Sequence, residues 1–304
     1  MAYELDKKLV IGVSSRALFD MSMENDIFER QGVEAFCKYQ VEHENEVLKP
    51  GPGFSLIRSL LAINKLPGQE GRVEVIIMSR NSADTSLRVF NSIGHYGLDI
   101  TRASLVSGAS LAPYLNAFKT DLFLSAYEDD VRSAIDSGIA AGIIYSDGVH
   151  HYDTENQRGD GLIRIAFDGD AVLFSDASER IFQQEGLEAF EANERDNAKD
   201  PMKQGPFAKL LKTISDLQKE FPADKVPIRT ALVTSRNAPA HERVIRTLRA
   251  WNVRIDEAHF LGGISKRDVL EAFGAQIFFD DQAVHTERAS EVVPAARVPV
   301  GGVS

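Results

Sequence analysis

The sequence predicts an α/β fold made of two tandem, duplicated Rossmann-like domains, each a three-layer αβα arrangement with a mainly parallel sheet and small helical cap insertions. Short apolar runs alternate with longer amphipathic stretches, which is the pattern of strands and helices in such a sheet. The second half of the chain repeats the first at an offset of about 154 positions, too long for a short solenoid unit. The repeated pairs are Ile27–Phe36 with Ile181–Phe190, Met78–Asn81 with Thr234–Asn237, and Leu122–Leu124 with Ile277–Phe279.

In the first copy, apolar runs are assigned to strands and amphipathic stretches to helices. The expected strands are Leu9–Val13, Val73–Ile77, Ala103–Val106, Leu122–Leu124 and Gly142–Tyr145. The expected helices are Asn25–Glu46, Phe54–Asn64, Ala83–Tyr96 and Leu111–Phe118.

The second copy shows the same alternation. Its expected strands are Ile163–Phe167, Thr230–Val233, Ala258–Leu261, Gln276–Phe279 and Arg297–Val300. Its expected helices are Ser178–Ala192, Pro206–Glu220, Ala240–Trp251 and Lys266–Phe273. Between the copies, the segment 147–161 is polar, turn-rich and aperiodic, which is typical of a linker, and the loop Arg195–Gly205 has the same character. We therefore expect one domain at 1–150 and another at 151–304.

Composition and charge narrow the classes of function. The 304 residues are 43% hydrophobic and 26% charged, as in soluble globular proteins with room for about two domains. The net charge of −11 argues against nucleic-acid binding, although a local cationic pocket can still bind a small anion. The single cysteine, Cys37, excludes an intrachain disulfide and a cysteine metal cluster. The polar start and the lack of a long apolar run favour a cytoplasmic protein that does not cross a membrane.

Two acidic residues in the second copy stand just beyond an expected strand. Ile163–Phe167 runs into Asp168-Gly169-Asp170, at the carboxyl end where open parallel sheets bind ligands. Residues two apart in an extended chain share a face, so both carboxylates can point into one crevice. One carboxylate could attack phosphorus to form an acyl-phosphate while the other protonates the leaving oxygen. Taken alone, the motif is more often a solvated turn.

Three further signals follow in the second copy. Thr234 and Ser235 come after a strand, where a hydroxyl can donate to phosphate or cap the next helix. Lys266 is the first residue of an expected helix, where the helix dipole disfavours a positive charge. It could bind a catalytic or substrate charge there, or it could be an ordinary exposed lysine. Asp280-Asp281 follows an apolar strand, and these adjacent like charges favour a bound cation such as Mg²⁺ or a helix cap.

The first copy provides an internal control for these signals. It aligns Ser14-Ser15-Arg16 with Asp168-Gly169-Asp170, Met78 with Thr234, Leu111 with Lys266, and Ser125-Ala126 with Asp280-Asp281. The apolar strand residues persist, whereas the candidate chemical groups are absent together. Acids that only cap helices and lysines that only lie on the surface would not be expected to be replaced together in one copy. We therefore predict that the second copy is catalytic, that the first is degenerate and non-catalytic, and that Arg16 is either a relic or an anion contact.

The order Asp-x-Asp, then Thr/Ser, then Lys, then an acidic pair resembles the signature of haloacid dehalogenase-like phosphohydrolases. Longer segments resemble the cytosolic 5′-nucleotidase I family, and the similarity extends over nearly the whole chain. These segments are Val13–Asp20, Glu42–Glu46, Pro50–Pro52, Ala166–Asp176 and Phe278–Gln282. The resemblance implies Mg²⁺-dependent hydrolysis of nucleoside 5′-monophosphates, AMP among them, in the cytoplasm.

The resemblance also implies a role for each candidate residue. Asp168 would be the nucleophile, and Asp170 the general acid and then the general base. Thr234, Ser235 and Lys266 would hold the phosphoryl group. The metal ligands would be Asp168, Asp280, Asp281 and the backbone carbonyl of Asp170.

Two other functions stay open at this point. The same chemistry could serve a sugar phosphate or another small phosphoester, and a non-enzymatic nucleotide-sensing protein is the third reading. The implied partner is a nucleoside monophosphate, with no nucleic acid and no membrane. The sequence leaves open a nucleotide effector, a homo-oligomer, and the preference for base and sugar.

Overall fold

The structure is a computed structural model and describes residues 4–145 and 160–299. The chain divides into two compact units, Met1–Glu155 and Asn156–Ser304. The expected linker at 147–161 lies outside the described residues except for its last two positions, and so does the expected boundary after residue 150. We describe each unit by itself.

The first unit contains a parallel sheet in the order β7-β6-β1-β4-β5. Its strands are β1 (Leu9–Val13), β4 (Val73–Ser79), β5 (Arg102–Leu105), β6 (Leu122–Ser125) and β7 (Ala140–Ile144). A short antiparallel pair, β2 (Phe19–Asp20) and β3 (Lys49–Pro50), lies outside this sheet. The α-helices are α1 (Ser15–Leu18), α2 (Ser22–Glu42), α3 (Phe54–Ala62), α4 (Leu87–His95), α5 (Ala112–Ala117) and α6 (Glu128–Asp136).

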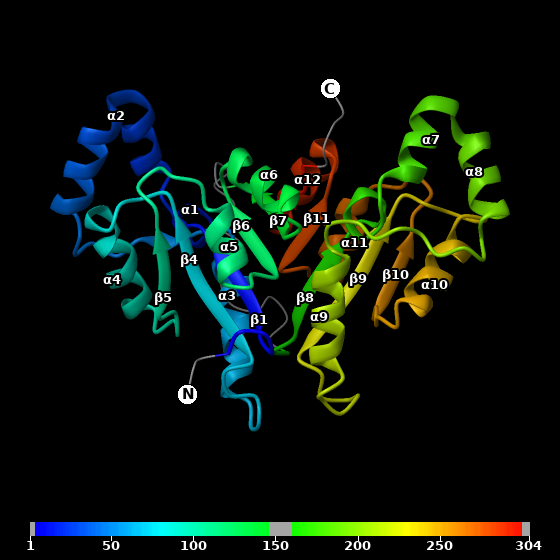
Figure 1. Cartoon of the computed structure of the whole chain (residues 1–304), viewed down its shortest axis with the longest axis horizontal. Helices are drawn as coiled ribbons and strands as arrows, with labels where there is room; N and C mark the ends of the chain where they lie inside the picture. Colours follow the sequence, from blue (N-terminus) through cyan, green and yellow to red (C-terminus); the bar gives the residue numbers. More distant parts are fainter. Residues whose placement is uncertain (1–3, 146–159, 300–304) are drawn as a thin grey trace. The chain divides into compact units, whose positions relative to one another are not determined.

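The second unit has strands in the order β10-β9-β8-β11-β12, again parallel. They are β8 (Ile163–Phe167), β9 (Ile228–Thr234), β10 (Glu257–Phe260), β11 (Ile277–Asp280) and β12 (Ala295–Arg297). The α-helices are α7 (Ala177–Glu185), α8 (Leu187–Asp196), α9 (Ala208–Gln218), α10 (His241–Ala250), α11 (Lys266–Phe273) and α12 (Ala283–Ser290). In both units the first strand is central, the next two lie to one side, and the last two to the other (Figure 1).

Helices pack on both faces of the second sheet, so its strands are buried on both sides. One face carries Ala166, Val233 and Phe278 against Leu270 and Phe273 of α11. The opposite face packs Phe167 and Phe279 against Phe207, with ring centroids 6.2 and 4.6 Å from the Phe207 ring. Continuous apolar strands of this kind are typical of a parallel sheet covered by helices. The predicted mainly parallel α/β class is confirmed.

The strand pairings allow the two units to be compared residue by residue. Val13 pairs with Leu124 in the first unit, and Phe167 pairs with Phe279 in the second. The residues that follow these pairs therefore correspond, so Ser14 and Ser125 stand where the second unit has Asp168 and Asp280.

The same comparison corrects one sequence alignment. Val13 pairs with Ile77 and Phe167 with Leu232, so Thr234 corresponds to Ser79 and not to Met78. A matching hydrogen bond supports this register. The amide of Asn81 donates to Ser79 Oγ at 3.2 Å, as the amide of Arg236 donates to Thr234 Oγ1 at 3.3 Å. The first unit thus retains one hydroxyl at a position where the alignment gave none.

A helix pair extends beyond one end of the sheet in each unit (Figure 1). In the second unit it consists of α7 and α8, which meet at Gly186 with φ 85° and ψ −175°. In the first unit α2 is broken at Gly32, where φ is 84° and ψ is −178°. Residues with a Cβ rarely adopt such angles, so glycine is needed at both breaks. These two pairs are the candidates for the expected small helical cap insertions, and each is a broken helix where the sequence predicted a single one.

Other elements differ from the sequence expectation in specific ways. The helices α1, α6 and α12 were not expected, and α6 (Glu128–Asp136) begins with three acids that obscure its few apolar positions. The last strand, β12, lies at Ala295–Arg297 and not at 297–300, and residue 300 lies outside the described residues. No helix within the described ranges is both long enough and apolar enough to span a bilayer.

Gly205 offers a test of the close backbone contact that closes the loop after β8. A Cβ at this position would lie 2.3 Å from the carbonyl oxygen of Phe174 and 2.5 Å from that of Val172. We expect Gly205→Ala to lower the free energy of unfolding by about 1–3 kcal/mol or more, because two backbone segments must separate. Gly94→Ala is the matched control, since nothing lies within 4 Å of that position in α4. Urea unfolding of both variants measures the difference, and equal stabilities would contradict this packing.

Candidate active site

Asp168 and Asp280 are brought together by the pairing of two neighbouring strands. Phe167 ends β8 and pairs with Phe279 of β11, and the amide of Asp168 donates to the Phe279 carbonyl at 2.8 Å. Asp168 directly follows β8, and Asp280 is the last residue of β11. Both carboxylates therefore lie at the carboxyl edge of the sheet. Asp168 is 5% exposed and Asp280 is fully buried.

Lys266 lies between these two acids. It is the first residue of α11, and its Nζ lies 2.8 Å from Asp168 Oδ1 and 2.6 Å from Asp280 Oδ2. The other oxygen of Asp280 accepts a hydrogen bond from the amide of Gln282 at 2.9 Å. Asp281 completes the cluster, since one carboxylate oxygen from each of the three acids lies within 4.8 Å of the others. One ammonium therefore faces three carboxylates.

This imbalance of charge changes the proton affinities of the site. Burial raises the pKa of Asp168 to about 7, with Lys266 opposing the shift and Asp280 adding to it. Burial also raises the pKa of Asp281 to about 8, and the charges of Asp168 and Asp280 act in the same direction. Burial alone would lower the pKa of Lys266, but Asp168 and Asp280 more than compensate and raise it. The lysine therefore stays charged, but its single positive charge does not balance the three acids.

Asp170 points to a different partner. Arg236 Nε and Nη2 donate to its two carboxylate oxygens at 2.7 and 2.6 Å. The Nη1 atom of the same arginine donates to Glu194 Oε2, and Arg243 lies 2.9 Å from Glu194 Oε1. Ser178 Oγ also donates to Glu194 Oε1, at 2.8 Å. Since Ser178 and Glu194 belong to α7 and α8, one buried network joins the helix pair to the loop that carries Asp170.

The remaining sequence candidates separate into buried and exposed positions. Thr234 ends β9, beside β8, and is 1% exposed. Its Oγ1 would lie 3.4 Å from a Cβ built on Gly169, so it faces the turn between the two acids. Ser235 is exposed. The structure thus brings together Asp168, Lys266, Asp280 and Asp281, with Thr234 next to their loop.

Sequence reasoning missed Arg236, Glu194 and Arg243. Arg236 stood in the quoted Thr234-Ser235-Arg236 motif but was weighed only for the hydroxyls, and no sequence signal marked Glu194 as buried. The charges of the site also shift the pKa values of two half-buried groups. The pKa of Glu179 is raised by burial and by Asp170 and Asp168, and the pKa of His285 is lowered by burial and by Lys266.

The cluster fits a hard divalent cation. Its donors are carboxylate oxygens, which Mg²⁺ and Ca²⁺ prefer, and no thiol or imidazole belongs to the group within the described ranges. Burial and, after it, the neighbouring carboxylates raise the pKa values of Asp168 and Asp281, and a bound cation would offset both effects. The side-chain carboxylate of Asp170, which binds Arg236, is outside this group.

The comparison with known proteins adds a decisive observation. A family model described as 5′-nucleotidase matches residues 1–304. The chain belongs to the 5′-nucleotidase family. It is 38% identical over 294 residues to the human (Homo sapiens) protein called cytosolic 5′-nucleotidase 1B, a match that covers 93% of this chain and 47% of the human protein. The chain thus spans about half the length of that relative.

Among solved structures, histidinol dehydrogenase from Elizabethkingia anophelis aligns with a TM-score of 0.23 and 9% identity, covering 97% of this chain and 53% of that one. So low a score supports no conclusion about fold or function. Membership of the 5′-nucleotidase family confirms the resemblance seen in the sequence.

The buried like charges predict that Asp281→Asn stabilises the metal-free protein. The folded pKa of Asp281, about 8, lies above its ordinary value of 3.8, so the associated stability is present at low pH and is lost as the pH rises towards 8. We expect the melting temperature of the variant to exceed that of the wild type by a few degrees near pH 8.5, and by less near pH 6. Saturating Mg²⁺ should raise the wild type more than the variant.

Differential scanning calorimetry with and without a chelator measures these shifts. Asp268→Asn is the control, because the Asp268 side chain is 79% exposed. Equal melting of wild type and Asp281→Asn at both pH values without metal would show that the carboxylate is not held among like charges.

The network around Arg236 predicts a second stability difference. Arg236→Met would leave Asp170 and Glu194 without their shared partner, and Glu194 is fully buried. We expect a loss of about 3–5 kcal/mol in the free energy of unfolding. Arg246→Met removes an exposed i,i+4 pair with Glu242 and should cost less than about 1 kcal/mol. Urea unfolding of both variants tests this, and similar small losses would contradict a buried network.

Proposed function

We propose that this chain is a Mg²⁺-dependent 5′-nucleotidase that hydrolyses nucleoside 5′-monophosphates, with AMP as the expected substrate, to a nucleoside and inorganic phosphate. The observation that carries the proposal is the buried contact of Lys266 with both Asp168 and Asp280 at the carboxyl edge of a parallel sheet, in a member of the 5′-nucleotidase family. The chain's similarity to the human protein called cytosolic 5′-nucleotidase 1B supports a nucleotide substrate and a cytoplasmic location.

In the first step Asp168 attacks the phosphorus atom. A bond forms between its carboxylate oxygen and phosphorus, the bond from phosphorus to the 5′ oxygen breaks, and Asp170 gives that oxygen a proton. In the second step Asp170 takes a proton from water, which attacks the aspartyl-phosphate and releases phosphate. Lys266 and Thr234 hold the phosphoryl oxygens, with Ser235 at the rim of the loop.

Asp170 must leave Arg236 to do this work. Both of its oxygens accept hydrogen bonds from the guanidinium in the substrate-free protein, which is the arrangement of an ionised carboxylate. A protonated Asp170 cannot keep both contacts. We infer that substrate entry accompanies a turn of Asp170 away from Arg236, while Glu194 keeps the arginine in place.

Asp168, Asp280 and Asp281 would hold the Mg²⁺, together with the backbone carbonyl of Asp170. When bound, the ion would offset the charge of the acids and of the phosphate monoester, which otherwise repel each other. Lys266 supplies the other positive charge, at 2.8 Å from the nucleophile.

We also propose that the two units arose by duplication and that the second alone is catalytic. The shared strand order and the matching glycine breaks at Gly32 and Gly186 support a common origin. Ser14 and Ser125 stand at the positions of Asp168 and Asp280, and the sequence aligns Leu111 with Lys266. Since Ala126 follows Ser125 where Asp281 follows Asp280, the first unit lacks the nucleophile, the paired metal ligands and the lysine.

The decisive experiment is the Asp168→Asn variant. We expect AMP hydrolysis to fall by several orders of magnitude while far-UV circular dichroism stays unchanged, because an amide is a poor nucleophile of similar shape. Phosphate release is measured with Mg²⁺ and again with a chelator, which should also stop the reaction. Asp268→Asn, a substitution at an exposed site, should keep wild-type turnover.

Near-full activity of Asp168→Asn would overturn the mechanism. A substrate panel separates the alternatives. If ribose 5-phosphate is hydrolysed as well as nucleoside monophosphates, the enzyme is a general small-phosphoester phosphatase. If no phosphoester is hydrolysed, the result supports the hypothesis of a non-enzymatic nucleotide-sensing protein.

A further inference from the structure

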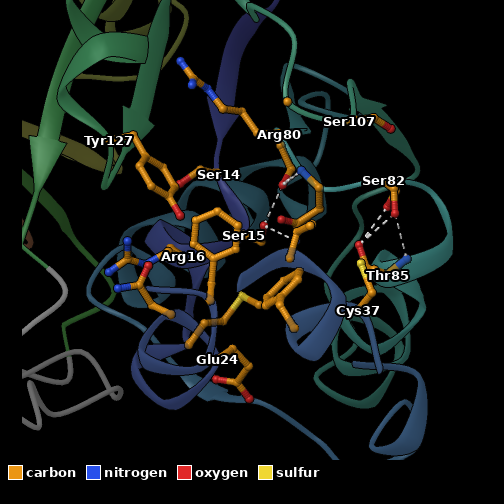
Figure 2. A pocket seen from close by; sticks show the side chains of 18 of the residues that line it. Ser14, Ser15, Arg16, Glu24, Cys37, Arg80, Ser82, Thr85, Ser107 and Tyr127 are labelled. Carbon is orange, nitrogen blue, oxygen red and sulfur yellow. Dashed lines mark hydrogen bonds between the residues drawn. The ribbon is translucent and has the colours of Figure 1, made fainter. Parts of the chain in front are cut away.

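A cavity of about 470 Å³ lies in the first unit (Figure 2). It opens where β1, β4 and β5 end. Ser14 to Arg16 follow β1, Ser79 to Ser82 lie at and after the end of β4, and Ser107 and Gly108 follow β5. The carboxyl ends of parallel strands are where open α/β sheets bind ligands, and the volume lies in the range of small-molecule pockets.

The lining of this cavity has an apolar wall and a polar floor. The helix α2 supplies the wall with Phe28, Val33 and Phe36, and Phe28 and Val33 are 41% and 60% exposed although they are large and apolar. Hydroxyl groups form the floor, where Ser15 Oγ and Ser79 Oγ lie 2.9 Å apart. A flat aromatic ring fits the wall, and a sugar with several hydroxyls fits the floor.

The charged groups at the cavity already have partners. Glu24 pairs with Arg88 at 2.5 Å, and Asp130 pairs with Arg80 at 2.6 Å. The Arg16 guanidinium lies 5.1 Å above the Tyr127 ring. Within the described ranges, the acids that lie close enough to share a metal ion are those of the second unit. The cavity therefore has neither a nucleophilic carboxylate nor a metal cluster of its own.

One polar atom at the cavity does lack a partner. Asn25 lines the cavity, and its Oδ1 is buried without a hydrogen-bond partner among the described residues. A buried acceptor without a donor is costly, so a ligand that supplies an N–H or O–H group would gain from this contact. An amino group of a base and a hydroxyl of ribose are both suitable donors.

We infer that the cavity of the first unit binds a nucleoside, either free or as its monophosphate, and does not hydrolyse it. The inference rests on the proposed function for the choice of a nucleoside and goes beyond it by adding a second site. Ser14 stands at the position of the nucleophile Asp168, so a bound nucleotide meets no carboxylate there, and within the described ranges no metal cluster lies at the cavity. The apolar wall of α2 holds the base, and Asn25 with the hydroxyl floor holds the sugar.

Cys37 offers a direct reporter, because it is the single cysteine of the chain and lines the cavity. The experiment measures the rate at which iodoacetamide alkylates the thiol in the full-length protein, by mass spectrometry. We expect saturating adenosine to slow alkylation about tenfold. The AMP arm uses the Asp168→Asn variant, so that the nucleotide is not consumed. Inorganic phosphate with Mg²⁺ should leave the rate unchanged.

A variant locates the protection. Asn25→Leu keeps the side-chain volume but removes the acceptor, and should weaken protection by adenosine at least tenfold. Asn116→Leu, at an exposed position on α5, is the matched control and should be protected like the wild type. Isothermal titration gives the dissociation constant of adenosine for both variants, and unchanged circular dichroism confirms that they fold.

The outcomes separate this inference from the proposed function. Unchanged alkylation with adenosine and with AMP, in a protein that hydrolyses AMP, overturns the second site and leaves the nucleotidase intact. Protection by adenosine in a wild type that hydrolyses no nucleotide supports the site and refutes the nucleotidase. Protection by AMP alone assigns the site to monophosphates. Equal protection by ribose 5-phosphate, or full protection of Asn25→Leu, overturns the inference.

Discussion

The burial of Lys266 between Asp168 and Asp280 is the constraint on which the rest of the site depends. Three carboxylates at one edge of a sheet repel one another, and a buried ammonium offsets only part of that charge. The arrangement requires β11 to lie beside β8, since only that pairing brings Asp168 next to Asp280. It also leaves a deficit of positive charge, which in the proposed function a bound cation would offset.

A second charge network, centred on Arg236, lies beside the cluster around Lys266. Arg236 holds Asp170 on one side and Glu194 of α8 on the other. The first unit has amides at both corresponding positions, with Asn81 in place of Arg236 by strand register and Gln40 in place of Glu194 by the sequence repeat. An arginine and a glutamate that depend on each other are thus both absent where Asp170 is absent, as expected if the network serves that acid.

Much of the fold could be predicted from the sequence, because buried strands and amphipathic helices leave periodic patterns; β1, β8 and α11 lie where they were expected. Asp168, Thr234 and Asp280 could be proposed as site residues because they stand at strand ends, and Lys266 because it begins a helix. The strand order was beyond the sequence, since it depends on which apolar faces meet in space. The role of Arg236 was missed because its partner, Glu194, is distant in the chain and looks like a surface acid. The acidic helix α6 was missed because its apolar positions are few.

The helix pair of the second unit meets at a single glycine, and Ser178 and Glu194 tie its two arms together. If the pair tilts, its two arms would move as one body, and Glu194 would carry that tilt to Arg236. Thermodynamic reciprocity follows from this connection. A molecule that favours one orientation of the pair would change the free energy needed for Asp170 to leave Arg236, and the departure of Asp170 would change the affinity for that molecule by the same amount. Recognition and proton transfer would then be one equilibrium seen from two ends.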